Sequence, residues 1–206
     1  MTPSIEVVNC LASDAYIKDT GIIADAVKII LDVKGVLNVW YGLQIEEPQR
    51  TYVVIAWDSI ASHHAFEAET DKYERFRALL KPSMAQPPEL ELYHADLEGD
   101  YAAPFNAPVT EFALAAPKAG VTVEALRGLL EKIRPEVNLE DRCPAKASSF
   151  GLVTEKPQTF LHAVGWESIE SHHDTVKAGP FADLVKEIRA VRDGSFVHAK
   201  LTRASK

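Results

Sequence analysis

The sequence predicts an α+β fold made of two copies of one unit. Three observations lead to this prediction: an internal repeat, alternating β-type and helical stretches, and an Ala- and Pro-rich segment between the copies. The eight residues 57–64, WDSIASHH, recur 109 positions later as WESIESHH, and five upstream residues match at the same spacing. A match of this length is not accidental, so the chain is a duplicated unit of about 100 residues.

The first copy, residues 1–98, is predicted to form a strand, a helix, two strands, a helix and a strand. Apolar residues follow helical spacing after Thr20, a candidate N-cap, and Gly35 follows the last turn. Two β-branched and aromatic runs flank a turn with Pro48, which predicts an antiparallel hairpin. The expected bounds are strands at 5–11, 36–45, 51–57 and 89–97, and helices at 22–33 and 59–80, the latter broken near residue 70.

The second copy, residues 109–206, repeats this order, and residues 99–108 form the expected linker. The order βαββαβ is that of ferredoxin-like units, in which an antiparallel sheet carries helices on one face only. The open faces of two such sheets can cover each other. We therefore expect two tandem ferredoxin-like units packed sheet to sheet as an intramolecular, pseudo-dimeric α/β barrel, and a monomer in solution.

Composition and charge exclude several classes of protein. The 206 residues include 22 basic and 30 acidic side chains, a net charge of −8, so nucleic acids and anionic membranes are poor partners. Cys10 and Cys143 are too few for a disulfide framework or a zinc site of four thiolates. The first residues lack the apolar core of a leader, and no stretch is apolar enough to span a membrane. We expect a cytoplasmic protein.

The sequence contains four motifs: the hairpin segment 41–43 (YGL), strands ending at Trp57 and Trp166, the Ser-Ile-x-Ser-His helix start, and the closing strand with Tyr93 and His94. Together they resemble the dimeric α/β-barrel superfamily, and within it the antibiotic-biosynthesis-monooxygenase (ABM) domains of fungal tandem-repeat proteins. Members of that superfamily include cofactor-free oxygenases that make quinones from phenols, polyketide cyclases, haem-degrading enzymes and stress-responsive proteins. The resemblance implies a ligand cavity in each unit, between the sheet and its helices.

The histidines are the candidate catalytic residues. Six of the seven are paired by the repeat, whereas His162 aligns with Val53. Adjacent helical residues project about 100° apart, so one histidine of each His-His pair points inward. Ile60 lies four residues before His64, which predicts that His64 and its counterpart point inward. The candidates are therefore His173, His64, His162, His198 and His94, and the alternative is that all are structural remnants of the duplication.

Aromatic side chains are the candidate walls of a site for a flat substrate. Trp57 and Trp166 share a strand face with the residues two and four positions before them, so they lie at the base of the expected cavity. The alternative is that both only fill the core. The candidate substrate-binding residues are Trp166, Trp57, Tyr52, Tyr93, Trp40, Tyr41 and Phe150, with His63 and His172 at the rim.

No metal or cofactor is expected. Adjacent histidines lack the i, i+4 spacing of helical zinc sites, and no carboxylate is placed to complete such a site. The chain has no GxSxG elbow, P-loop or dinucleotide-binding glycine motif. A haem would need one axial histidine and a wide pocket, an alternative that the sequence leaves open.

The functional hypothesis is a cofactor-independent enzyme acting on a hydrophobic, aromatic or polyketide-like small molecule of secondary metabolism. A neutral imidazole, with a pKa of about 6.5, can take a proton from a phenol or an acidic carbon. The carbanion then reduces oxygen, as in a monooxygenase. One alternative is a non-redox cyclase, isomerase or decarboxylase that begins with the same step, and another is a non-catalytic, small-molecule-binding or stress-responsive barrel.

Overall fold

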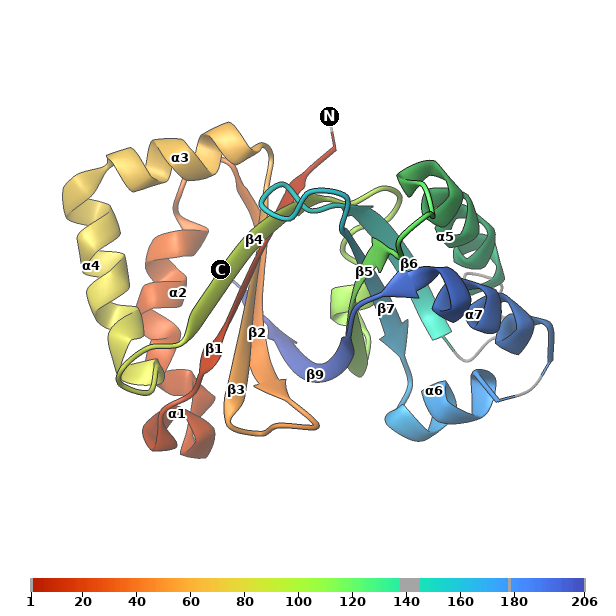
Figure 1. The fold of residues 1–206 in the computed structure, drawn as a ribbon. Helices are drawn as coiled ribbons and strands as arrows, with labels where there is room; N and C mark the ends of the chain where they lie inside the picture. The colour runs from red at the N-terminus through yellow and green to blue at the C-terminus, as the bar shows by residue number, and fades with distance from the viewer. Residues whose placement is uncertain (1, 138–144, 178, 206) are drawn as a thin grey trace. The chain divides into compact units, whose positions relative to one another are not determined.

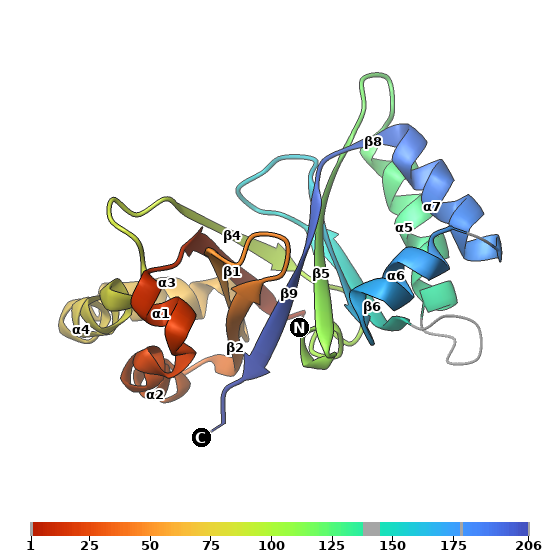
Figure 2. The ribbon, with the colours of Figure 1, turned by 90° about the horizontal axis from the view of Figure 1, so that it is seen from below.

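The computed structural model describes residues 2–137, 145–177 and 179–205 (Figure 1). The chain divides into two compact units, Met1–His94 with Leu201–Lys206, and Ala95–Lys200. Each unit is an antiparallel sheet with helices on one face, as the βαββαβ order predicts (Figures 1 and 2). In the described part of the chain, no helix has the length and apolar character needed to cross a membrane.

The first unit has the sheet order β4-β1-β3-β2. Its β1–β3 and β2–β3 pairs are antiparallel, and β2 and β3 form the hairpin predicted around Pro48. The elements are β1 (Ser4–Leu11), α1 (Asp14–Lys18), α2 (Ala24–Leu31), β2 (Val36–Gln44), β3 (Arg50–Trp57), α3 (Ile60–Ala68), α4 (Thr70–Leu80) and β4 (Leu90–Asp96).

The second unit has the equivalent order β9-β5-β7-β6, with the short strand β8 paired to the end of β5. Helices α5 and α7 pack side by side over this sheet (Figure 2). The elements are β5 (Val109–Pro117), α5 (Val123–Val137), β6 (Ala145–Leu152), β7 (Phe160–Trp166), α6 (Ile169–Thr175), α7 (Gly179–Val191), β8 (Arg192–Asp193) and β9 (Phe196–Arg203). The predicted α+β fold of two ferredoxin-like units is confirmed.

Local sequence explains where the helices begin and end. Ser59 caps α3 by accepting a hydrogen bond from the Ser62 N–H, and the predicted break lies at Glu69, whose ψ of 68° is not helical. The start of the first helical region differs from the prediction. Asp19, not Thr20, caps the turn before α2, and the five-residue helix α1 is too short to give a periodic signal.

Both repeated tryptophans lie in the core between a sheet and its helices. The Trp57 side chain is 0% exposed and the Trp166 side chain 1% exposed. In the first unit Trp57 packs with Phe66 of α3 and Phe76 of α4. Both tryptophans are therefore core residues, as one of the two interpretations of the sequence expects.

We expect Trp166→Ala to lower the free energy of unfolding by about 3–5 kcal/mol, because removal of a buried indole leaves a large void. Urea denaturation of the full chain, followed by circular dichroism, measures this change. The control is Leu152→Ala, at a side chain that is 41% exposed, and it should change the free energy by about 0.5 kcal/mol or less. An unchanged denaturation midpoint for Trp166→Ala would show that the indole does not support the core.

Candidate functional site

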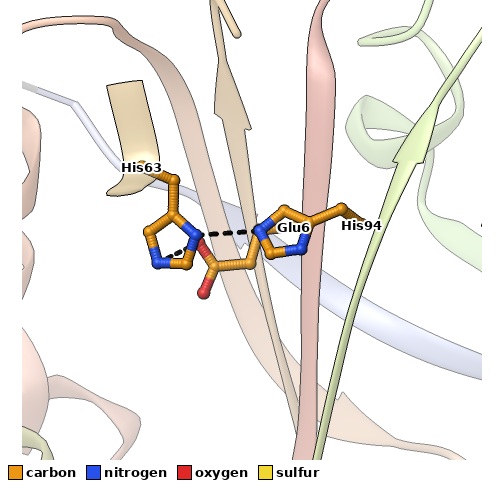
Figure 3. Close-up of side chains that lie close together, drawn as sticks. All are labelled: Glu6, His63 and His94. Carbon is orange, nitrogen blue, oxygen red and sulfur yellow. Dashed lines mark hydrogen bonds and ion pairs between the residues drawn. The ribbon is translucent and has the colours of Figure 1, made fainter. Parts of the chain in front are cut away.

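In the first unit, four buried side chains form one connected polar network, of which Figure 3 shows Glu6, His63 and His94. The Trp57 indole N–H donates to Glu6 Oε2 at 2.8 Å, and His63 Nε2 lies 3.7 Å from the same oxygen. His63 Nδ1 and His94 Nε2 share a hydrogen bond of 2.9 Å. The network therefore joins β1, the end of β3, the first turns of α3, and β4.

The second unit repeats this network with closely similar distances. The Trp166 indole N–H donates to Glu111 Oε2 at 2.9 Å, and His172 Nε2 lies 3.6 Å from that oxygen. His172 Nδ1 and His198 Nε2 are 2.8 Å apart. The His172 ring also stacks on the Trp166 indole, with ring centroids 4.5 Å apart. The duplication has thus preserved a carboxylate, an indole and two imidazoles together.

The inward-facing histidines are His63 and His172, so the predicted orientation of His64 and His173 is wrong. His64 is exposed and bonds to Glu67 at 3.0 Å, and His173 is also exposed. The buried face of α3 carries His63 and Phe66, which are three positions apart. Ile60 is only half-buried at the helix start, so it does not mark the inward face.

A cavity of about 50 Å³ lies beside the second network, between the sheet and the helices of that unit. Glu111, Trp166 and His172 line it, whereas the comparable cavity of the first unit, about 40 Å³, touches only Glu6 of the first network. At its edge Phe196 is 38% exposed and Arg189 is exposed. The volume holds only a few water molecules, so an aromatic ligand enters only if these edge side chains move.

Burial changes the pKa values of the titratable side chains that line the second cavity. It raises the pKa of Glu111 and lowers the pKa of Arg192, whose guanidinium also lines the cavity. Burial, together with Arg192, lowers the pKa of His162 from 6.5 to about 4. His162 Nε2 is 2.7 Å from the Ser148 hydroxyl. His162 is therefore neutral near pH 7 and stands apart from the His172–His198 pair.

The remaining aromatic candidates lie outside the networks. Trp40 pairs with Val54 of the neighbouring strand, and Tyr52 lies on the same face of β3 as Val54, so both side chains occupy the sheet face away from the helices. Tyr93 precedes His94 on β4 and therefore occupies that face as well. They do not line the expected cavity, because strand alternation turns them to the opposite face. Two others face the helices: Tyr41 packs in the cluster around Tyr16, and Phe150 lies beneath Arg127 and 6.4 Å from the His162 ring.

Glu6 and Glu111 are the site residues that the sequence analysis missed. Each is an acidic residue within an apolar strand, and the two align between the copies. An acidic side chain at a strand position that faces the core is the signal that could have identified them, because a buried carboxylate requires partners. Arg192 was also missed, since it follows a helix in a stretch without a periodic pattern.

The same donor groups could hold a metal ion, so the expectation that no carboxylate is placed beside these histidines is wrong. In each unit the carboxylate and two imidazoles offer ligand atoms that lie within 4.8 Å of one another, the donor set of two-histidine, one-carboxylate metal centres. The hydrogen bond between the two rings occupies one nitrogen of each, so a metal that used those nitrogens would have to replace the shared proton. A proton relay, in contrast, would use the hydrogen bond between the two rings without replacing its proton.

Cys10 takes no part in these networks. Burial raises the pKa of the Cys10 thiol to about 11, which disfavours the reactive thiolate. Cys143 lies outside the described residues.

Comparison with known proteins gives matches in structure only. No protein-family model and no curated protein matches this chain. A candidate monooxygenase from Fusobacterium nucleatum has a TM-score of 0.73 at 12% identity, covering 100% of this chain and 95% of its own. One from Lactobacillus acidophilus has a TM-score of 0.71 at 12% identity, covering 100% and 97%. An anthrone oxidase-like protein has a TM-score of 0.63 at 15% identity, covering 98% and 94%. The predicted resemblance to monooxygenase-type proteins is thereby confirmed at the level of fold.

We expect His162 to make stability fall as the pH falls from about 6.5 to about 4. In this range the unfolded chain binds a proton at His162 that the folded chain does not bind. His162→Val, the residue at the aligned position 53, should remove this effect. Between about pH 7.5 and about pH 5, urea denaturation should show a loss larger by about 2 kcal/mol for the parent than for the variant. Equal losses would mean that the folded chain protonates His162 normally.

Proposed function

We propose that the protein is a cofactor-independent, monooxygenase-type enzyme that takes a proton from a hydrophobic aromatic small molecule in its second unit. The observation that supports this most is that the Glu111–His172–His198 network borders a cavity that also holds a guanidinium. In the first unit the equivalent network meets its cavity only through Glu6. The second unit is therefore the proposed site.

His172 is the proposed base. In the tautomer that the proposal requires, His172 Nδ1–H donates to His198 Nε2, and Nε2, which lies 3.6 Å from the Glu111 carboxylate, carries the lone pair that accepts the proton. When Nε2 accepts a proton, the imidazolium that forms is stabilised by this carboxylate and by the bond to His198. Glu111 and His198 thus act as positioning residues. A base held in this way contributes about 10²–10⁴-fold to a rate.

Aromatic rings around His172 favour a flat substrate. Phe196 stands edge-on to the His172 ring with centroids 5.8 Å apart, and Phe181 stands edge-on to Trp166 at 6.3 Å. Phe196 is half-exposed, so its rotation can widen the entrance without disturbing the core. An aromatic ligand that enters here meets π surfaces on several sides.

The proposed reaction needs no external reductant. Loss of a proton from a CH₂ group between aromatic rings gives an electron-rich carbanion that can reduce O₂ itself. In the net reaction CH₂ + O₂ → C=O + H₂O, one oxygen atom enters the substrate and the other leaves as water. Anthrone contains such a group, and the anthrone oxidase-like neighbour suggests it as a probe.

The small cavity favours a second candidate, a protein that binds a small molecule without turnover. A volume of about 50 Å³ is far below the usual size of a ligand site. In that case the networks serve to hold each helix start against the sheet.

We expect the full chain to accelerate oxygen uptake by anthrone with formation of anthraquinone, and His172→Asn to reduce the rate by about 10²–10⁴-fold. An oxygen electrode and the absorbance of the quinone measure both quantities. His63→Asn, in the first unit, is the matched control, and His173→Asn tests the exposed neighbour. Both should stay within about tenfold of the parent, because neither ring lines the second cavity.

Two results would contradict this proposal. The first is a parent rate equal to that of anthrone in buffer alone. The second is an equal loss in His63→Asn and His172→Asn, since it would trace the effect to folding and not to the second cavity. Denaturation midpoints of the three variants separate lost turnover from lost stability.

A further inference from the structure

Arg192 is a guanidinium that the proton-abstraction step does not use. It is the first residue of β8, immediately after α7, and its side chain lines the second cavity together with Glu111 and His172. One Nη1–H donates to the Leu114 carbonyl at 3.1 Å. Among the residues that the structure describes, no carboxylate lies within ion-pair distance of Arg192. A guanidinium carries five N–H donors, so most of its hydrogen-bonding capacity is left for a ligand.

We propose that Arg192 binds an anionic oxygen of the ligand, so that the second cavity selects phenols and enols and holds them as phenolates or enolates. This inference rests on the proposed function and specifies the substrate class of the same site.

The charged side chains that line the cavity favour a ligand that enters as a neutral phenol or enol. Five titratable or charged side chains line it: Glu111, His162, His172, Arg189 and Arg192. Arg189 is exposed at the edge of the cavity, where water solvates its charge, so the charges that remain inside without ligand are those of Glu111 and Arg192, which offset each other. A neutral phenol that passes its proton to His172 creates two opposite pairs, phenolate with Arg192 and imidazolium with Glu111. No net charge is buried, whereas a ligand that entered already ionised would bring an unbalanced charge.

The first unit provides an internal comparison. His94 and His198 are aligned between the two copies, and the same offset along the chain aligns Arg192 with Pro88. Among the residues that the structure describes, no lysine or arginine lines the first cavity, which is bordered by groups such as Cys10 and Tyr16. The first unit therefore has a carboxylate and two imidazoles but no cation for an anionic ligand, and we assign phenolate binding to the second unit alone.

The test uses 4-nitrophenol, a single-ring phenol whose ionised form absorbs visible light. We expect the full chain to shift the ionisation of bound 4-nitrophenol to lower pH, and Arg192→Gln to weaken phenolate binding by about tenfold or more. Arg192→Lys keeps the charge but not the fork of donors, so it should restore part of the affinity. Absorbance titrations at fixed protein concentration measure the bound phenolate directly.

Two controls isolate the contact. Lys186→Gln removes one positive charge from the exposed surface of α7 and should leave phenolate affinity within about twofold. The neutral analogue 4-nitroanisole should bind the parent and Arg192→Gln equally. Equal phenolate affinity in the parent and Arg192→Gln overturns the inference, as does an equal loss in Lys186→Gln.

The readout separates this inference from the proposed function. Phenolate binding that depends on Arg192, with turnover unaffected by His172→Asn, would leave the ligand class standing and remove the catalytic proposal. Turnover that depends on His172, with phenolate binding that does not depend on Arg192, would support the catalytic proposal and overturn the assignment of the ligand class. The denaturation midpoint of Arg192→Gln, compared with that of Arg192→Lys, shows whether loss of the bond to Leu114 has altered the fold.

Discussion

Each unit buries a glutamate carboxylate between its sheet and its helices, and the surrounding residues are arranged to satisfy it. A carboxylate removed from water costs several kcal/mol unless donors replace the lost hydration. In both units an indole N–H at the end of a strand donates to it, and a histidine in the helix that follows lies within 4 Å. The serine cap two residues after the tryptophan starts the helix at the point where that histidine reaches the carboxylate. The repeated Trp-x-Ser-Ile-x-Ser-His segment is thus the part of the sequence that makes a buried carboxylate tolerable.

One network occurs in two different surroundings. In the first unit, the residues that line the cavity with Glu6 include Tyr16 and Cys10, whose pKa values are raised by burial, and the described lining contains no lysine or arginine. In the second unit, Arg192 and the partly exposed Phe196 line the cavity together with Glu111 and His172. Duplication leaves one copy free to maintain the fold while the side chains around the other change. The asymmetry of the cavities, more than the networks themselves, supports a single working site.

The repeat, the strand alternation and the hairpin turn were sufficient to predict the order of elements, because these are local patterns or direct copies. The break before Thr70 and the core position of Trp57 followed from the same signals. The prediction that His64 points inward is wrong because it rests on one apolar residue, Ile60. The face of α3 that points inward is the one on which His63 stacks against Trp57. Glu6 becomes a site residue only through contacts with two other elements, β3 and α3, and spacing along the chain does not encode such contacts.

The protonation state of His172 tests most directly whether the second network acts as a base. Long-range ¹H–¹⁵N NMR spectra of the full chain, with and without saturating 4-nitrophenol, distinguish a neutral imidazole from an imidazolium, and His172→Asn and His63→Asn assign the signals. Proton transfer within the second unit predicts that the ligand converts His172 to the imidazolium and leaves His63 unchanged. A neutral His172 in the saturated complex, or the same response from both histidines, would contradict it.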